Sequence, residues 1–461
     1  MPAHTLASSP FSREFSKTQS TRIRDCLCES VSLLKAMHIK LTYGRHGLTV
    51  TLPDTVDVLA PRFLPGLPDE PEALREALRN PIGSAPLAEL VKPGDSVVVV
   101  HTDITRATPN DRILPVLLDE LETAGIARNK ITLLNGLGTH RPQTEAELRV
   151  MLGDRIVEGY RCLQHDCSDD TNLVSLGETS LGHPVRLNRF YLEADVRILT
   201  GFIEPHFFAG FSGGPKAVIP SLAGAESVYT NHGLEMIAHP KASWGVIEGN
   251  PIWEEMREVA LRTNPAFLLN VSLNVRQEIT GIFAGDMLSA FATGCAFVKE
   301  NAMRAVDKPY DIVITTNSGY PLDQNLYQSV KGMSAANQIV RQGGTILIAT
   351  ACEDGLPNHG RYAMLLAEAG SPQSVVDIIS QPGFSAQDQW QVQIQAQIQR
   401  RADVYVYSDG LSDEQIERAL FIPCRSLEQT ISQLQEKYGS QARICVIPEG
   451  PQTIPYLRGD V

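Results

Sequence analysis

Residues 96–101 read SVVVVH, a run of β-branched residues that starts just after Gly94 and ends in a polar loop. A run without polar alternation is typical of a strand that is buried on both faces of a sheet. Helical spacing follows at 114–123, and another short apolar run follows at 130–134. This alternation of strand and helix predicts an α/β domain with a mainly parallel sheet.

The same rhythm continues in both directions along the chain. A hairpin is expected from Met37 to about residue 52, turning at Gly44–Gly47. Later strands are expected at 196–200, 266–274, 278–283, 311–316, 345–351, 402–407 and 443–447. Later helices are expected at 144–152, 225–231, 252–262, within 323–342, and at 412–419 and 427–437.

These elements predict two α/β domains with Rossmann-like sheets and an active site in the cleft between them. We expect the catalytic domain at 37–304, the second domain at 309–440, and a C-terminal segment at 441–461 that packs back on the first domain. Residues 1–36 are rich in Ser, Thr and Arg and lack the apolar core of a secretory signal. We expect them to be a disordered tail or an over-long start, with a transit peptide as the weaker alternative.

Composition excludes several classes of protein. The chain has 461 residues and a net charge of −13, and no apolar run approaches the ~20 residues needed to cross a bilayer. The negative charge disfavours a nucleic-acid partner, and the sequence predicts no membrane association. Eight sparse cysteines suit a reducing compartment, so a cytoplasmic location is expected.

Polar side chains follow the ends of three expected strands. In an open α/β sheet, ligands bind beyond the carboxyl ends of the strands. The candidate groups there are Asp103 and Arg106 after the first strand, His140 after the second, and His206, Lys216 and His232 after the third. They predict a shared cleft, with solvated loop residues as the alternative interpretation.

Familiar nucleotide-binding motifs do not fit this chain. GFSGGPK at 210–216 resembles a P-loop, but Pro215 precedes the lysine and Ala217 replaces the Ser or Thr that holds Mg²⁺. No GxGxxG opens a helix after the first strand, so an ordinary NAD site is disfavoured. Lys216 has apolar neighbours, which favours a lowered pKa and a role as nucleophile or covalent anchor.

One further cluster is ambiguous. Cys162, His165 and Cys167 could hold a soft metal, but no second CxxC pair follows, so a structural role is favoured. A hydrogen bond between His165 and Asp166 is one such role.

The chain resembles the nickel-dependent lactate racemase family from about Met37 to the C-terminus. The motifs that carry the resemblance are DITRATP at 103–109, GLGTHRP at 136–142, GFIEPHFFAGFSGGPKAVIPSLAG at 201–224, TNH at 230–232 and YQSVKG at 327–332. Members of this family use nickel in a pincer cofactor, a pyridinium-3,5-bisthiocarboxylic acid mononucleotide derived from nicotinic acid.

The resemblance implies a role for each matching residue. Lys216 would bind the cofactor covalently, His232 would be the protein ligand of nickel, and His140 and His206 would be the paired acid/base groups. Other expected cofactor-binding residues are Asp103, Ile104, Thr105, Arg106, Gln328 and Lys331. Expected substrate-binding residues are Arg106, Tyr327, Lys331 and Trp390.

The activity that the resemblance implies is racemisation of a 2-hydroxy acid, lactate first, by proton-coupled hydride transfer to and from the cofactor. Malate or a longer aliphatic or aromatic 2-hydroxy acid is an alternative substrate. A non-catalytic carrier of the nickel cofactor and an NAD-dependent dehydrogenase are alternatives of other classes. The expected partners are a small substrate and the enzymes that make the cofactor.

Overall fold

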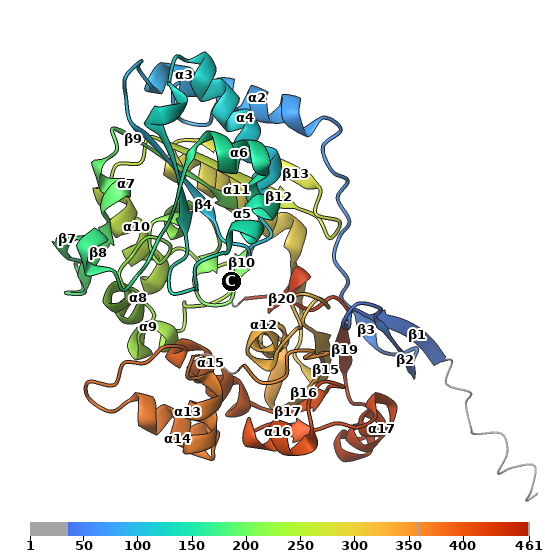
Figure 1. Ribbon diagram of the computed structural model, residues 1–461. Helices are drawn as coiled ribbons and strands as arrows, with labels where there is room; N and C mark the ends of the chain where they lie inside the picture. Colours follow the sequence, from blue (N-terminus) through green and yellow to red (C-terminus); the bar gives the residue numbers. More distant parts are fainter. Residues whose placement is uncertain (1–35, 358–359, 460–461) are drawn as a thin grey trace, which may run out of the picture.

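A computed structural model describes residues 36–357 and 360–459, and the expectations for residues 1–35 lie outside this range. The chain forms two six-stranded sheets, one in the upper and one in the lower part of Figure 1. The first sheet has the strand order β13-β12-β9-β4-β5-β6, and all its neighbours are parallel except β12 and β13. Its strands are β4 (Val97–Thr102), β5 (Ile131–Gly136), β6 (Arg161–Gln164), β9 (Val196–Phe202), β12 (Phe267–Leu273) and β13 (Ile279–Gly285).

The second sheet is parallel throughout and has the order β18-β17-β16-β15-β19-β3. Its strands are β3 (Asp57–Val58), β15 (Tyr310–Thr316), β16 (Val340–Ala349), β17 (Ala402–Tyr407), β18 (Ile422–Pro423) and β19 (Ile444–Ile447). The smaller pairs are β1 (Ala36–Leu41) with β2 (Leu48–Pro53), β7 (Leu173–Glu178) with β8 (Pro184–Asn188), β10 (Pro205–His206) with β11 (Gly210–Phe211), and β14 (Met303–Val306) with β20 (Ile454–Leu457).

Helices cover both sheets. Those of the first part are α2 (Glu70–Arg79), α3 (Leu87–Leu90), α4 (Asn110–Thr123), α5 (Glu145–Leu152), α6 (Asp154–Gly159), α7 (Arg189–Glu193), α8 (Ala225–Asn231), α9 (Leu234–Ala238), α10 (Pro251–Arg262) and α11 (Met287–Ala302). Those of the second part are α12 (Leu326–Asn337), α13 (Tyr362–Ala369), α14 (Pro372–Ile379), α15 (Gln389–Gln399), α16 (Asp413–Arg418) and α17 (Leu427–Tyr438).

The β-branched run of β4 lies between two cores, as the sequence predicts. Val97 and Val99 belong to the core beneath α2 and α4, whereas Val98 and Val100 belong to a core that continues into the second sheet. All four side chains are at most 1% exposed. Because β4 is central and buried on both faces, the loop at its carboxyl end is held by a rigid element.

The N-terminal hairpin corrects the expected domain division. Residues 37–58 were expected in the first domain, but β1 and β2 pack on the second sheet, where Leu41 and Val50 share a core with Ile312 and Ile314. The strand β3 then pairs with β19 at the edge of the same sheet. The cause is hydrophobic: this face of the second sheet would otherwise expose its apolar side chains to water.

The C-terminal segment also differs from the expectation. Residues 444–447 form β19, an inner strand of the second sheet, instead of packing back on the first domain. The strand β20 turns toward the first part, where it pairs with β14, which follows the end of α11.

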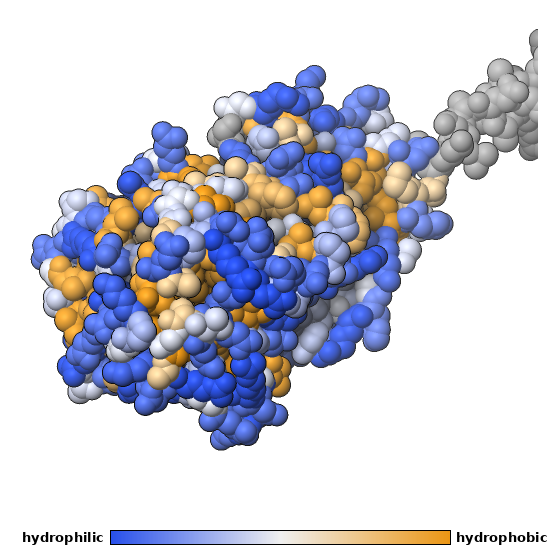
Figure 2. Space-filling model, turned by 90° about the horizontal axis from the view of Figure 1, so that it is seen from above, coloured by the Kyte–Doolittle hydropathy of each residue, from blue (hydrophilic) through white to orange (hydrophobic). Residues whose placement is uncertain are grey.

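In residues 36–357 and 360–459, no helix is both long and apolar enough to cross a bilayer. The face shown in Figure 2 is largely hydrophilic, with apolar groups scattered between polar ones.

Candidate active site

The loop after β4 and the loop after β5 meet through one ion pair. Asp103 Oδ2 lies 2.7 Å from His140 Nδ1, and Asp103 Oδ1 accepts hydrogen bonds from the backbone N and the Oγ1 of Thr105 at 2.7 and 2.5 Å. The Asp103 side chain is 3% exposed, whereas that of His140 is 41% exposed. Both carboxylate oxygens are therefore engaged inside the protein, while the far side of the imidazole faces the solvent.

The ion pair keeps Asp103 ionised. Burial alone raises the pKa of this carboxyl group, but the His140 hydrogen bond, the positive charges of His140 and Arg106, and the Thr105 hydroxyl together hold it well below its usual value.

The segment after β9 brings a histidine and a lysine together. His206 ends β10, and Lys216 lies on a single 3₁₀ turn, η3 (Gly214–Ala217). The Lys216 Nζ is 3.3 Å from His206 Nε2, and the backbone N–H of Ala209 donates to His206 Nδ1 at 3.3 Å. Both ring nitrogens of His206 therefore have a defined partner.

The two glycines before Lys216 allow this turn to lie deep in the fold. Gly213 and Gly214 have φ of +83° and +54°, a region that favours glycine. A Cβ on Gly214 would lie 2.5 Å from a ring carbon of Phe291, and the Gly214 N–H donates to Asn270 Oδ1 at 2.8 Å. The GGPK sequence thus fixes the lysine against the sheet.

Burial and neighbouring positive charges bring the pKa of Lys216 close to neutral pH, so its neutral amine is accessible there. Its surroundings lower its pKa to about 7, through burial first and then through the charges of Arg106 and Lys331. The pKa of His206 lies well below its ordinary value because of burial and of the cations Lys216, Lys331 and Arg106. Both groups are therefore available with a lone pair.

His232 caps the end of α8 and is 4% exposed. Its ring lies edge-on to Phe208 and Trp390, with centroids 4.9 and 5.5 Å away, and its Nδ1 is buried without a hydrogen-bond partner. Burial and the charge of Lys216 lower its pKa to about 3. A buried, neutral imidazole with an unpartnered nitrogen is a suitable metal ligand.

The second part of the chain supplies the opposite wall. Lys331 on α12 feels the charges of Arg106, Glu204 and Asp103, and burial with Arg106 lowers its pKa to about 8. Tyr327, on the same helix, is partly buried, and this burial raises its pKa. Trp390 is 8% exposed and comes from α15.

Two of the expected cofactor-binding residues have less defined surroundings. Ile104 is 39% exposed, and the Gln328 backbone N–H is bonded to Asn325 Oδ1 within the first turn of α12. Both residues are sequence neighbours of other candidates, Ile104 of Asp103 and Gln328 of Tyr327. Their roles in cofactor binding stay predictions.

Glu204 is a charged residue of the site that the sequence analysis missed. It lies two residues before His206, where burial raises its pKa, and the charges of Lys331, Arg106 and Lys216 act on it. The signal was present in the GFIEPH motif, since a carboxylate in an otherwise apolar segment needs a cationic partner.

His165 has a structural environment, but its partner differs from the expected one. Its Nε2 donates to the carbonyl of Ala223 at 3.0 Å, and its Nδ1 accepts from Asn188 Nδ2 at 3.2 Å. Asp166 instead accepts from the N and Oγ of Ser168, because this short loop needs a cap.

No group of three or more His, Cys, Asp or Glu side chains in the described part of the chain is arranged to hold a metal.

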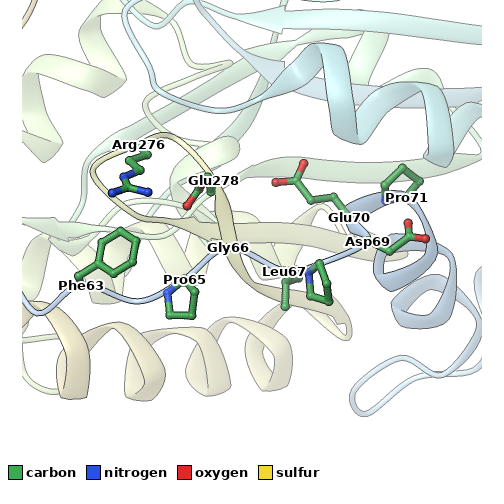
Figure 3. A pocket seen from close by; sticks show the side chains of 10 residues that line it. Phe63, Pro65, Gly66, Leu67, Asp69, Glu70, Pro71, Arg276 and Glu278 are labelled. Carbon is green, nitrogen blue, oxygen red and sulfur yellow. The ribbon is translucent and has the colours of Figure 1, made fainter.

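Two cavities of the structure are not lined by His140, His206, Lys216 or His232. One of about 610 Å³ is formed by the segment 63–71 and by Arg276 and Glu278 of the β12–β13 turn (Figure 3). The other, about 260 Å³, has Glu204 in its wall, together with residues 61–64, 202–205, 272–275 and the segment that follows β19. Glu204 therefore lines this cavity and also interacts with the cations of the candidate site.

Two protein families match the chain. The family described as "Lactate racemase N-terminal domain" matches residues 43–245, and the one described as "Lactate racemase C-terminal domain" matches residues 305–454.

Individual relatives agree with these matches. A lactate racemase of Thermoanaerobacterium thermosaccharolyticum is 36% identical over 424 residues, 90% of this chain and 99% of the relative. A lactate racemase of Lactiplantibacillus plantarum is 38% identical over 384 residues, 83% and 90% of the two chains.

Solved structures agree as well. The lactate racemase apoprotein from T. thermosaccharolyticum superposes with a TM-score of 0.85 at 35% identity and covers 91% of this chain and all of that one. A Thermotoga maritima protein at 20% identity, with a TM-score of 0.64 over 86% of this chain and all of that one, shares the fold.

Proposed function

The chain belongs to the lactate racemase family, and from this premise we propose that it is an isomerase that interconverts the D and L forms of a 2-hydroxy acid, with lactate as the preferred substrate. The observation that carries the proposal is the grouping of the Asp103–His140 pair, the His206–Lys216 pair and His232 around one set of strand ends. A carrier of the cofactor would need none of the proton-handling groups in this set.

The donor set fits a nickel-pincer nucleotide better than a metal held by protein alone. His232 offers one unpartnered imidazole nitrogen, and no three-residue metal cluster exists among the described residues. A single protein ligand requires the remaining ligands to come from an organic group, and imidazole suits Ni(II). The neutral amine of Lys216 supplies a nucleophile for covalent attachment.

The polar groups around Lys216 suit the rest of such a cofactor. Arg106 and Lys331 are cations suited to its phosphate, and the 103–106 loop and Gln328 would complete the pocket. When bound, the cofactor supplies the acceptor for the hydride that a 2-hydroxy acid gives up at its α-carbon.

The protein's own groups handle the rest of the substrate. Arg106 has the planar guanidinium that grips a carboxylate with two hydrogen bonds. His140 and His206 are the side chains that face the hydroxyl group of the substrate, and Tyr327 and Trp390 line the apolar side. The buried Trp390 and the partly buried Tyr327 would limit the access of water to the site, which strengthens electrostatic contacts in it.

The test uses protein produced together with the enzymes that make the cofactor. Single enantiomers of lactate, malate and longer 2-hydroxy acids are incubated with it, and chiral chromatography follows both forms. We expect D- and L-lactate to interconvert. Inversion of malate without lactate would change the proposed substrate, and absence of inversion with every acid would refute the activity.

A further inference from the structure

Helix α10 carries a carboxylate in the stripe of residues that faces the core. Its buried residues are Ile252, Glu255, Met256, Val259 and Ala260, which recur at the spacing of one helical face. Four of them are apolar, and the fifth is a glutamate whose side chain is 1% exposed. A charged group in such a place is unfavourable unless hydrogen bonds compensate for the water that it loses. The position of Glu255 therefore points to a role beyond packing.

Three side chains provide this compensation. The hydroxyl of Thr179 donates to Glu255 Oε1 at 2.7 Å, and His183 Nδ1 lies 2.8 Å from the same oxygen. The other oxygen, Oε2, accepts a hydrogen bond from Asn231 Nδ2 at 2.7 Å. Thr179 and His183 belong to the turn between β7 and β8, whereas Asn231 is the last residue of α8. The carboxylate thus joins α10 to two separate segments, with one oxygen for each.

The side chain of Asn231 is held mainly through this contact. It is completely buried, and its amide nitrogen also donates to the carbonyl of Ile252 at the longer distance of 3.3 Å. Its Oδ1 is buried without a hydrogen-bond partner. A flipped amide would set this oxygen against the carboxylate, so Glu255 also fixes which way the amide points. Without the carboxylate, Asn231 would keep one long hydrogen bond.

Asn231 directly precedes His232, which caps the end of α8. This helix has seven residues, and no side chain caps its N-terminus. A helix of that length is marginal on its own and frays at its ends unless tertiary contacts hold it. The bond between Asn231 and Glu255 holds the last turn against α10, so it fixes the backbone from which the His232 side chain projects.

The ring of His232 depends on this backbone for its direction. Its Nδ1 has no hydrogen-bond partner, and the ring packs edge-on against Phe208 and Trp390. Such packing limits the space of the ring without the directional bond that a polar partner would give. His165 and His183 differ in this respect, since their ring nitrogens have hydrogen-bond partners of their own.

We propose that Glu255 is a positioning residue for His232: through the amide of Asn231 it holds the end of α8 and sets the direction of the imidazole that binds nickel. This inference rests on the proposed function, in which His232 is the protein ligand of nickel. Removal of a residue that orients a metal ligand typically weakens metal binding 10- to 100-fold.

Nickel retention tests the role on the full chain, made together with the cofactor pathway. Glu255→Leu nearly keeps the size of the side chain and removes its hydrogen-bond acceptors, so it should release nickel to a chelator about 10- to 100-fold faster than wild type. Glu255→Gln should stay close to wild type, because its carbonyl oxygen can still accept from Asn231 while its amide nitrogen donates to the Thr179 hydroxyl. Release from Glu255→Leu at the wild-type rate would overturn the proposal.

Two variants serve as matched controls. Glu258, also on α10, accepts from the backbone N and the Oγ of Ser180 in the β7–β8 turn, and its hydrogen bonds do not reach α8. Glu258→Leu should therefore keep the wild-type rate of nickel release. His183→Ala removes a partner of Oε1 but leaves the Asn231 bond, so it should keep that rate as well. Equally fast release from Glu258→Leu and Glu255→Leu would show a general loss of structure and overturn the proposal.

Non-additivity separates positioning from a general effect on the fold. Asn231→Ala breaks the same contact from the other side and leaves the bonds of Glu255 to Thr179 and His183 in place. If Glu255 acts through Asn231, the double variant should release nickel no faster than the faster single variant, whereas effects that multiply would overturn the proposal. If Glu255→Leu fails to fold, Asn231→Ala decides alone, and release at the wild-type rate would overturn the proposal.

The ring of His232 also gives a readout that needs no cofactor. In the full chain with isotope-labelled histidine, its ring hydrogens lie beside two aromatic rings, so their chemical shifts depend on the direction of the imidazole. We expect these shifts to move in Glu255→Leu and to stay in Glu258→Leu, with the exposed His38 as the reference. Unmoved His232 signals in Glu255→Leu would overturn the proposal.

The two proposals fail in different ways. Loaded wild-type protein that holds no nickel would refute the proposed function, while the NMR comparison still decides whether Glu255 orients His232. Wild-type protein that holds nickel and inverts lactate, with the same rate of nickel release in Glu255→Leu, would refute the role of Glu255 and leave the racemase assignment in place.

Discussion

His140 Nδ1 lies 2.7 Å from Asp103 Oδ2, and this contact joins the loops that follow the neighbouring strands β4 and β5. The carboxylate is almost completely buried and the imidazole is partly exposed, so one end of the pair is fixed and the other faces the solvent.

Asp103→Asn should lower kcat about 10²- to 10⁴-fold, because an amide that donates to His140 Nδ1 moves the ring proton to Nε2 and removes the base. The measurement is kcat and KM for both lactate enantiomers, with ¹⁵N NMR of the His140 ring. Asp403→Asn, which removes a surface partner of Lys437, is the matched control. Lost activity with an unmoved His140 proton would contradict this role of Asp103.

The same assay contains an internal check. The two lactate enantiomers have equal free energy in water, so kcat/KM must be equal in the two directions for every active variant. A variant can therefore affect the two directions differently only through compensating changes in kcat and KM. A variant with unequal kcat/KM values would indicate a faulty assay and not a change in mechanism.

Lys216→Met should abolish the mass adduct on protein made together with the cofactor pathway, because the side chain then has no amine. Intact mass and peptide mapping are the measurements, and Lys241→Met is the control. An unchanged adduct in Lys216→Met would place the attachment elsewhere.

His232→Ala should lose nickel while the fold is kept, because it removes an imidazole whose buried Nδ1 has no hydrogen-bond partner. Nickel per chain is measured by elemental analysis, and circular dichroism checks the fold. His183→Ala is the comparison, since that ring is bonded to Glu255 at 2.8 Å. Equal nickel in wild type and His232→Ala would exclude His232 as the ligand.

Acid should destabilise the protein through its buried neutral histidines. Burial lowers the pKa of His101 to about 4 from an unfolded value near 6.5, so between these values the unfolded chain binds a proton that the folded chain does not. Stability therefore falls as the pH drops from about 6.5 toward 4. At pH 5 the cost is about 2 kcal/mol for this one group.

The comparison that isolates this effect is His101→Asn, which cannot titrate in this range. Urea unfolding at pH 7 and pH 5 should show a larger loss in wild type than in the variant. The same loss in both would assign the acid sensitivity to other groups.

Much of the fold could be predicted because periodicity and burial agree. Residues 96–101 have no alternation, and β4 is buried on both faces, as expected. The segments at 266–274 and 278–283 alternate around a polar turn and form the hairpin β12–β13. A local pattern of this kind predicts whether one face or both faces of a strand are buried.

Helix α15 shows where such patterns fail. Residues 391–399 read QVQIQAQIQ, a period of two that favours a strand, yet they form a helix in which Gln391, Gln393 and Gln395 are all buried. Their amides donate to the carbonyls of Tyr327, Leu234 and Ala419. These hydrogen bonds to distant parts of the chain stabilise the helical conformation of the segment, and a local sequence pattern does not contain them.

The candidate site has the same limit. Strand ends located His140, His206 and Lys216, because ligand sites follow strand ends in this fold class. Glu204 was missed because its cationic partners come from separate segments, including α12 of the second part. The hairpin was assigned to the wrong part for a similar reason, since its apolar face fits a sheet built from residues 310 onward.

The hairpin on the second sheet has a consequence for how the molecule is built. From residue 36 the chain first lies in the second part, crosses to the first part near Leu59–Leu67, and returns at residues 303–309, so the first part is nested as an insertion within the second. A fragment beginning at residue 305 would lack β1, β2 and β3 and would leave Ile312, Ile314 and Leu347 uncovered. Such a piece should aggregate when expressed alone, whereas residues 60–302 keep all six strands of their own sheet.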